Sequence, residues 1–154
     1  MNLMMIGPHT RRFIYQQLFD NDLSISDLFA QGNVPAWEKT LLRVAAPAIK
    51  AAMIRDMAIH PRATENSQRA FEGEFEFVAG LLRDGRRYLC GDTFTAADIT
   101  FAALSAPVLL PENYGAKLPW LDGSAAGTAI RSVVENYRST AAGAFAMRLY
   151  REHR

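Results

Sequence analysis

Hydrophobic residues recur with helical spacing in nearly every segment of the chain. The clearest case is residues 64–83, where apolar positions recur at i, i+4, i+7 and i+11 on one face: Phe71, Phe75, Val78 and Leu82. No run alternates between apolar and polar residues as a half-buried strand would. The pattern predicts an all-α protein in which helix takes about two thirds of the chain, well above the usual third.

Proline, glycine and short polar residues set the expected helix boundaries. At this length we expect one domain, residues 8–154, after a short N-terminal extension, residues 1–7. Its helices are expected over residues 8–20, 35–59, 64–83, 95–110, 124–138 and 144–151. Ser26 predicts a further turn of helix that ends at Gly32, and residues 113–123 predict a loop.

Two of these helices are unusual in their apolar pattern. Residues 35–59 should be kinked at Pro47 and should bury one stripe: Trp37, Leu41, Ala45, Ala48, Ala52 and Met53. Residues 95–110 are apolar on almost every side, and Pro107 should bend their last turn. A helix that is hydrophobic all round is buried, so we expect this one at the centre of the bundle.

Composition excludes several classes of protein. The formal net charge of +1 over 154 residues argues against a nucleic-acid-binding domain. A single cysteine, Cys90, excludes a disulfide framework and a cysteine-based zinc site, and we expect it to be a small buried hydrophobic residue. Three widely spaced histidines do not suggest a metal site. Without a signal sequence or a run of about 18 apolar residues, we expect a soluble, cytoplasmic protein that does not enter membranes.

The segment 94–99 carries the most specific motif, Phe-Thr-Ala-Ala-Asp-Ile. Thr95 is expected to be the N-cap of the central helix, with Asp98 three residues later completing a reciprocal capping box. Phe94 and Ile99 stand at the positions of a hydrophobic staple. The capping role accounts fully for Asp98, so we do not expect it to be catalytic.

Together with the preceding Tyr88-Leu89-Cys90-Gly91-Asp92, this motif resembles the glutathione transferase family. The C-terminal, all-helical domain of that family carries a similar run: an aromatic-Leu-x-Gly-Asp stretch, then an aromatic residue, Ser or Thr, two small residues, Asp and an apolar helix. The order of helices and the closing residues 142–150 are also similar. The resemblance implies a helical bundle like this C-terminal domain, with the capped helix buried.

One departure from the family is large. Complete family members begin with a thioredoxin-like domain that supplies the glutathione site and the residue that activates the thiol, and no βαβ pattern is present here. We therefore expect no catalytic residue, and no cofactor unless a thioredoxin-like partner supplies the site for glutathione. By position, the resemblance places a hydrophobic-ligand pocket along the first helix, at His9, Arg12, Phe13 and Gln16. The alternative is that Phe13 belongs to the core and the three polar residues form a solvated rim.

Two functions follow as hypotheses. In the first, the chain is a binding or assembly module that self-associates or docks to a protein partner. Its contact surface would be the apolar flank that the thioredoxin-like domain normally covers, on the first helix, the capped helix and the tail. In the second, the chain is the hydrophobic-substrate half of a transferase that joins glutathione to an electrophile once a thioredoxin-like domain is supplied.

Overall fold

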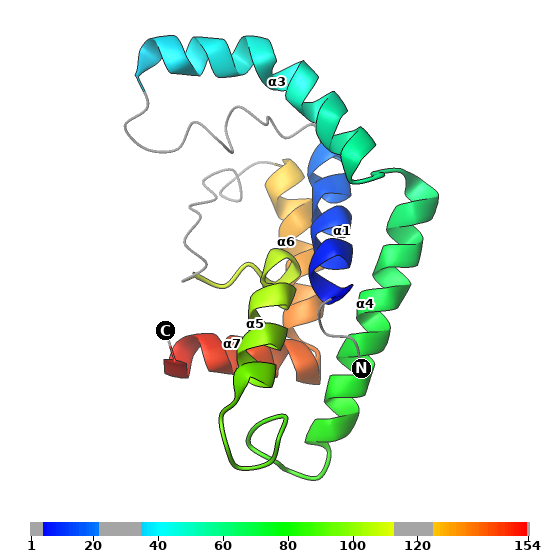
Figure 1. Cartoon of the computed structure of the whole chain (residues 1–154), viewed down its shortest axis with the longest axis vertical. Helices are drawn as coiled ribbons and strands as arrows, with labels where there is room; N and C mark the ends of the chain where they lie inside the picture. The colour runs from blue at the N-terminus through cyan, green and yellow to red at the C-terminus, as the bar shows by residue number, and fades with distance from the viewer. Residues whose placement is uncertain (1–4, 22–34, 113–124, 154) are drawn as a thin grey trace.

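A computed structural model describes residues 5–21, 35–112 and 125–153, and within these residues it contains helices and no sheet (Figure 1). The helices are α1 (Ile6–Asp20), α3 (Ala36–Asp56), α4 (Pro61–Leu82), α5 (Ala96–Leu109), α6 (Ala125–Arg138) and α7 (Ala141–His153). The predicted all-α class is confirmed. The turn expected at Ser26 and the loop expected at residues 113–123 lie outside the described residues.

Helix α5 holds the centre of the bundle, because α1, α6 and α7 all pack against it. Helix α1 lies between α4 and α5, while α7 crosses the lower end of the bundle (Figure 1). Helix α3 arches over the opposite end and lies outside the bundle along most of its length (Figure 1). The expected central position of the apolar, capped helix is therefore confirmed.

An aromatic cluster forms the main core. Phe71 and Phe101 are completely buried, and the ring of Phe71 meets those of Phe13 and Tyr137 edge to face, with centroids 5.4 and 5.1 Å apart. Such pairs contribute about 0.5–1.5 kcal/mol each beyond the area they bury. The buried Phe71, Phe75 and Val78 confirm the predicted apolar face of α4. A smaller cluster between α1, α6 and the C-terminal half of α3 extends this core: Ile14, Leu18, Phe19, Ile59, Ile130 and Val134.

Three helices begin earlier than the sequence predicts, and α1 and α4 are the first two. Helix α1 begins at Ile6, and Ile6 is completely buried, so only the residues before it can be an extension. Pro8 fits there because the first N–H groups of a helix have no intrahelical partner. Helix α4 begins at Pro61 and not at Thr64, because the His60 side chain caps it by accepting from the N–H of Ala63 at 3.3 Å. The prediction took His60 and Pro61 as the end of the preceding helix.

Helix α7 also begins early, at Ala141 in place of Ala144. Thr140 is its N-cap, and the Thr140 hydroxyl accepts from the N–H of Gly143 at 3.0 Å. At Gly143 the backbones of α7 and α6 lie close together, since a Cβ atom there would lie 1.9 Å from the carbonyl oxygen of Tyr137. A glycine is therefore required at this contact.

Candidate functional site

The capping box at the start of α5 is present, and its carboxylate is completely buried. Asp98 Oδ2 accepts from the N–H of Thr95 at 2.8 Å and from the Thr95 hydroxyl at 3.0 Å. The other oxygen, Oδ1, accepts from the N–H of Leu89 at 2.8 Å. Asp98 therefore caps the helix and also ties the preceding turn to it, a second role that the spacing of Thr95 and Asp98 does not reveal.

The segment before the cap is a tight turn. Tyr88 and Gly91 pair through two backbone hydrogen bonds, of 2.8 and 3.0 Å. Gly91 has a φ of 93°, in the left-handed region that favours glycine. Cys90, at the tip of the turn, is exposed, so the expectation that it is a buried hydrophobic residue is wrong.

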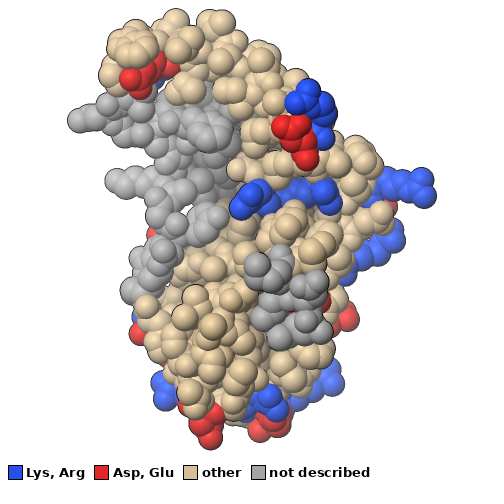
Figure 2. Space-filling view, viewed as in Figure 1, with Lys and Arg blue, Asp and Glu red and all other residues tan. Residues whose placement is uncertain are grey.

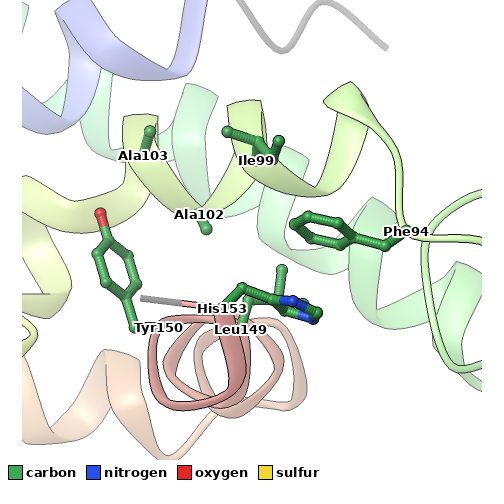
Figure 3. Close-up of a pocket in the computed structure, with 7 residues that line it drawn as sticks. All are labelled: Phe94, Ile99, Ala102, Ala103, Leu149, Tyr150 and His153. Carbon is green, nitrogen blue, oxygen red and sulfur yellow. The ribbon is translucent and has the colours of Figure 1, made fainter.

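An open cavity of about 270 Å³ lies beside this cap, between α5 and α7. Ile99, Ala102 and Ala103 contribute its α5 side, and the C-terminal end of α7 contributes the other (Figure 3). Its walls are largely apolar, and the full lining is Phe94, Ile99, Ala102, Ala103, Leu149, Tyr150 and His153. An apolar or aromatic group of small size suits such a cavity.

Phe94 and Ile99, the two residues of the predicted staple, both line this cavity (Figure 3). Phe94 packs against the core and stacks on the ring of His153, with centroids 4.0 Å apart and planes 9° apart. Ile99 is 55% exposed. A hydrophobic staple between Phe94 and Ile99 would therefore bury little of Ile99. The stacking partner of Phe94 is instead His153, at the C-terminal end of α7.

The four residues expected to line a pocket on the first helix lie where α1 packs against α4. Phe13 is a core residue, 4% exposed, with its ring edge to face against Phe71. Gln16 donates to Asp20 Oδ1 at 2.6 Å and accepts from the hydroxyl of Thr64 at 3.4 Å. The core position of Phe13 agrees with the alternative interpretation, in which Phe13 belongs to the core and does not line a ligand pocket.

His9 and Arg12 belong to a hydrogen-bonded chain that joins α1, α4 and the end of α3. Arg12 donates through Nε to the carbonyl of Met57 at 2.6 Å and through a terminal nitrogen to Ser67 Oγ at 2.7 Å. Ser67 Oγ is 3.1 Å from His9 Nδ1. Burial, and then the nearby charge of Arg12, lower the pKa of His9. The polar rim is thus a set of helix-to-helix bonds.

Among the described residues, four of the seven exposed large hydrophobic side chains lie on α3, where no residue is buried. Trp37, Leu41 and Val44 are 67%, 60% and 75% exposed. Figure 2 shows this end of the molecule as an uncharged surface between charged side chains near its two edges. We call the exposed line of residues at alternating spacings of four and three the outer stripe: Trp37, Leu41, Val44, Ala48, Ala51 and Arg55.

The side of α3 that faces the bundle is the opposite one. Ala46, Ile49 and Met53 pack partly buried against the smaller core cluster, and at 100° per residue they lie across the helix from the outer stripe. The predicted stripe placed Trp37, Leu41 and Ala48 in the interior, which is wrong. Both sides of α3 are apolar, so periodicity does not decide which one is covered.

The expected apolar flank on the first helix and the tail is also corrected. The large apolar residues of α1, among them Ile6, Phe13 and Leu18, are buried within the bundle, as are Phe145 and Leu149 of α7. The capped helix contributes Ile99 to the exposed apolar surface, as expected. Most of that surface lies on α3.

Among the described residues, the side chains that could hold a metal ion do not gather in groups of three or more. No helix in this part of the chain combines the length and the apolar character that a membrane-spanning helix requires.

No family model, curated protein or solved structure matches the chain. The resemblance to glutathione transferases therefore stays a prediction that depends on the motif around Thr95 and Asp98.

Proposed function

We propose that the chain is a binding or assembly module that resembles the C-terminal domain of glutathione transferases and contacts a protein partner through the outer stripe of α3. The observation that carries this proposal is the exposure of Trp37, Leu41 and Val44 on a helix that buries none of its residues. Exposed apolar patches of a few hundred Å² mark interaction surfaces in many proteins.

The composition of the stripe supports an interface. Trp and aliphatic residues on one helix face are the anchors that helix-in-groove and helix-to-helix recognition use. Covering a large apolar side chain completely yields about 1.5–3 kcal/mol. Three such residues on one helix face can offset part of the cost of association.

Tryptophan fluorescence tests whether the stripe is a binding surface. The chain has two tryptophans, so replacing Trp120 by Phe leaves Trp37 as the reporter. We expect a dilute sample to show red-shifted emission, rapid quenching by acrylamide and binding of an apolar dye. The double substitution Leu41→Glu and Val44→Glu should remove most of the dye binding.

Phe77→Glu is the matched control, because Phe77 is an exposed apolar residue of α4, 46% exposed, that lies away from α3. It should leave dye binding nearly unchanged. Equal dye binding by the α3 variant and the parent chain, with a Trp37 that acrylamide does not reach, would contradict the proposed function.

The apolar cavity between α5 and α7 favours a second candidate function, the hydrophobic-substrate half of a transferase. Its lining suits an aromatic electrophile, and a thioredoxin-like domain would have to supply and activate glutathione. The test is conjugation of glutathione to an aromatic electrophile, with and without an added thioredoxin-like domain. Ala103→Trp, at an exposed position of the lining, should fill the cavity and reduce any such activity.

A further inference from the structure

We infer that the partner of the outer stripe is a second copy of this chain, bound with the two α3 helices antiparallel. This inference rests on the proposed function and names its partner. It follows from the order of residues along α3, which makes the stripe complementary to itself when one copy is turned around.

The outer stripe has the same spacing in both directions from Ala46. Val44 and Ala48 stand two residues from that centre, and Leu41 and Ala51 stand five residues from it. Trp37 and Arg55 complete the pattern at nine residues on either side. A twofold axis at the centre therefore brings each residue of one copy opposite its counterpart in the other, as a closed symmetric dimer requires.

The paired residues are complementary in size and chemistry. The N-terminal half of the stripe holds bulky apolar residues, and the C-terminal half holds two alanines and Arg55. An antiparallel pair thus sets Val44 against Ala48 and Leu41 against Ala51, so a large side chain meets a small one at both of these central layers. A parallel pair would set Leu41 against Leu41 and leave the alanines facing each other across a gap.

The outermost pair joins Trp37 of one copy to Arg55 of the other. A guanidinium over an indole face is the strongest common cation–π arrangement. Arg55 is now 2.9 Å from Asp56, but their side chains are 81% and 64% exposed, and such a surface ion pair contributes little. Arg55 is therefore available for a new contact at small cost.

Charge on the two flanks of the stripe does not oppose the pairing. The flanking positions from residue 40 to residue 54 are uncharged: Thr40, Ala45, Pro47, Ala52 and Ile54. The basic residues Lys39 and Arg43 lie across the helix from the stripe, at 100° per residue, and do not face the second copy. An interface centred on Ala46 thus brings no like charges together.

The size of the face sets the strength of the dimer. A helix of 21 residues is about 31 Å long, and one helix face buries less than the roughly 800 Å² per partner of a standard interface. Helix α3 contains Pro47 near its middle and is arched (Figure 1), which concentrates contact on Val44 and Ala48. We therefore expect a reversible dimer whose population rises with concentration.

Sedimentation equilibrium over a range of concentrations tests this inference. We expect the full chain to show a monomer–dimer equilibrium, and Val44→Glu to raise the dissociation constant by roughly tenfold or more, because a central hot spot is lost. Leu41→Glu should act in the same direction, and circular dichroism verifies that both variants fold. Phe77→Glu, the same kind of change at an exposed apolar position of α4, should leave the dissociation constant unchanged.

Cross-linking tests the antiparallel arrangement. In a Cys90→Ser background, a chain with Val44→Cys is mixed with a differently tagged chain with Ala48→Cys, and the mixture is mildly oxidised. Disulfides require Cα atoms within about 7 Å, so the antiparallel dimer yields mostly the mixed product. A predominance of the product that joins position 44 to position 44 would overturn the antiparallel arrangement.

The remaining outcomes separate this inference from the proposed function. A chain that stays monomeric at every concentration, or a dimer that Val44→Glu does not weaken, overturns the inference. If the monomeric chain still binds apolar dye through Leu41 and Val44, the stripe serves a different protein and the proposed function stands. If dye binding is also absent, both proposals fail.

Discussion

Helices α3 and α5 have similar amino-acid compositions and opposite surroundings. Both are rich in alanine and aliphatic residues, and both contain an internal proline, Pro47 in α3 and Pro107 in α5. Yet α5 buries seven of its 14 residues, and α3 buries none of its 21. Because α1, α6 and α7 surround α5 while α3 meets the bundle along one side, neighbours and not composition decide which apolar helix is covered.

The helix starts differ in the same way. Helix α5 opens on a completely buried carboxylate that satisfies nearby backbone donors. Helix α3 opens on Pro35 without a side-chain cap, in a place where water reaches its first N–H groups. A buried helix end must have protein partners, whereas an exposed one can rely on solvent. This contrast can be tested by substitution and by a change of pH.

Asp98→Ala should cause the largest loss. It leaves the buried N–H of Leu89 without an acceptor, at about 1–3 kcal/mol, and removes the acceptor of the partly buried N–H of Thr95, so we expect a loss of about 2–5 kcal/mol in the free energy of unfolding. Urea denaturation measures the loss. Asp92→Ala, at an exposed carboxylate of the same segment, is the control, and an equal effect of the two changes would contradict the anchoring role.

Gly143→Ala should destabilise the packing of α7 against α6. The added Cβ would lie 1.9 Å from the backbone oxygen of Tyr137, which cannot move without shifting α6, so we expect a loss of about 3 kcal/mol. Gly73→Ala is the matched control, since nothing lies within 4 Å of a Cβ there. In helix α4 that change should stabilise the fold by about 0.5–1 kcal/mol. Thermal denaturation of both variants should give shifts of opposite sign.

A valine in each helix gives the most direct comparison. Val108 of α5 is completely buried and Val44 of α3 is 75% exposed. Val108→Ala should cost about 2 kcal/mol through lost contacts and a cavity, while Val44→Ala should change the stability of the monomer by less than about 0.5 kcal/mol. Denaturation at low protein concentration measures both changes. Comparable losses would mean that α3 is covered within one chain.

The contact between α1 and α4 should weaken slightly at acid pH. Burial lowers the pKa of His9 from its ordinary 6.5, so the folded protein favours the neutral ring, whose Nδ1 lies 3.1 Å from Ser67 Oγ. The unfolded chain binds more protons below pH 6.5, so stability is complete above that value and falls as the pH drops through it. His9→Gln should lose this part of the pH dependence, which unfolding at a series of pH values measures.

Local patterns allowed the sequence to predict a large part of this structure. Thr95 and Asp98 lie three residues apart, so their capping role depends on nothing beyond one turn of helix. The apolar face of α4 was predictable for a similar reason, because Phe71, Phe75 and Val78 leave one side clearly marked. The order of the helices also followed from prolines and polar breaks.

Features that depend on distant partners could not be predicted in the same way. The carboxylate of Asp98 reaches Leu89, and Arg12 reaches Met57 and Ser67, through contacts that no short-range spacing encodes. In α3 the stripe was assigned to the interior because alanine suits either side of a helix. The exposure of Cys90 follows from a tight turn at Tyr88–Gly91 that places its side chain outside.

The hydrogen bond from Thr10 to the carbonyl of Leu104 has a consequence for the order of folding. It joins α1 to a helix that is synthesised 94 residues later, whereas the bond between Leu89 and Asp98 closes a loop of nine residues. Short loops close in well under a microsecond, and long-range contacts form late because more chain entropy is lost. During translation, α1 therefore cannot form its final contact with α5 until α5 has left the ribosome.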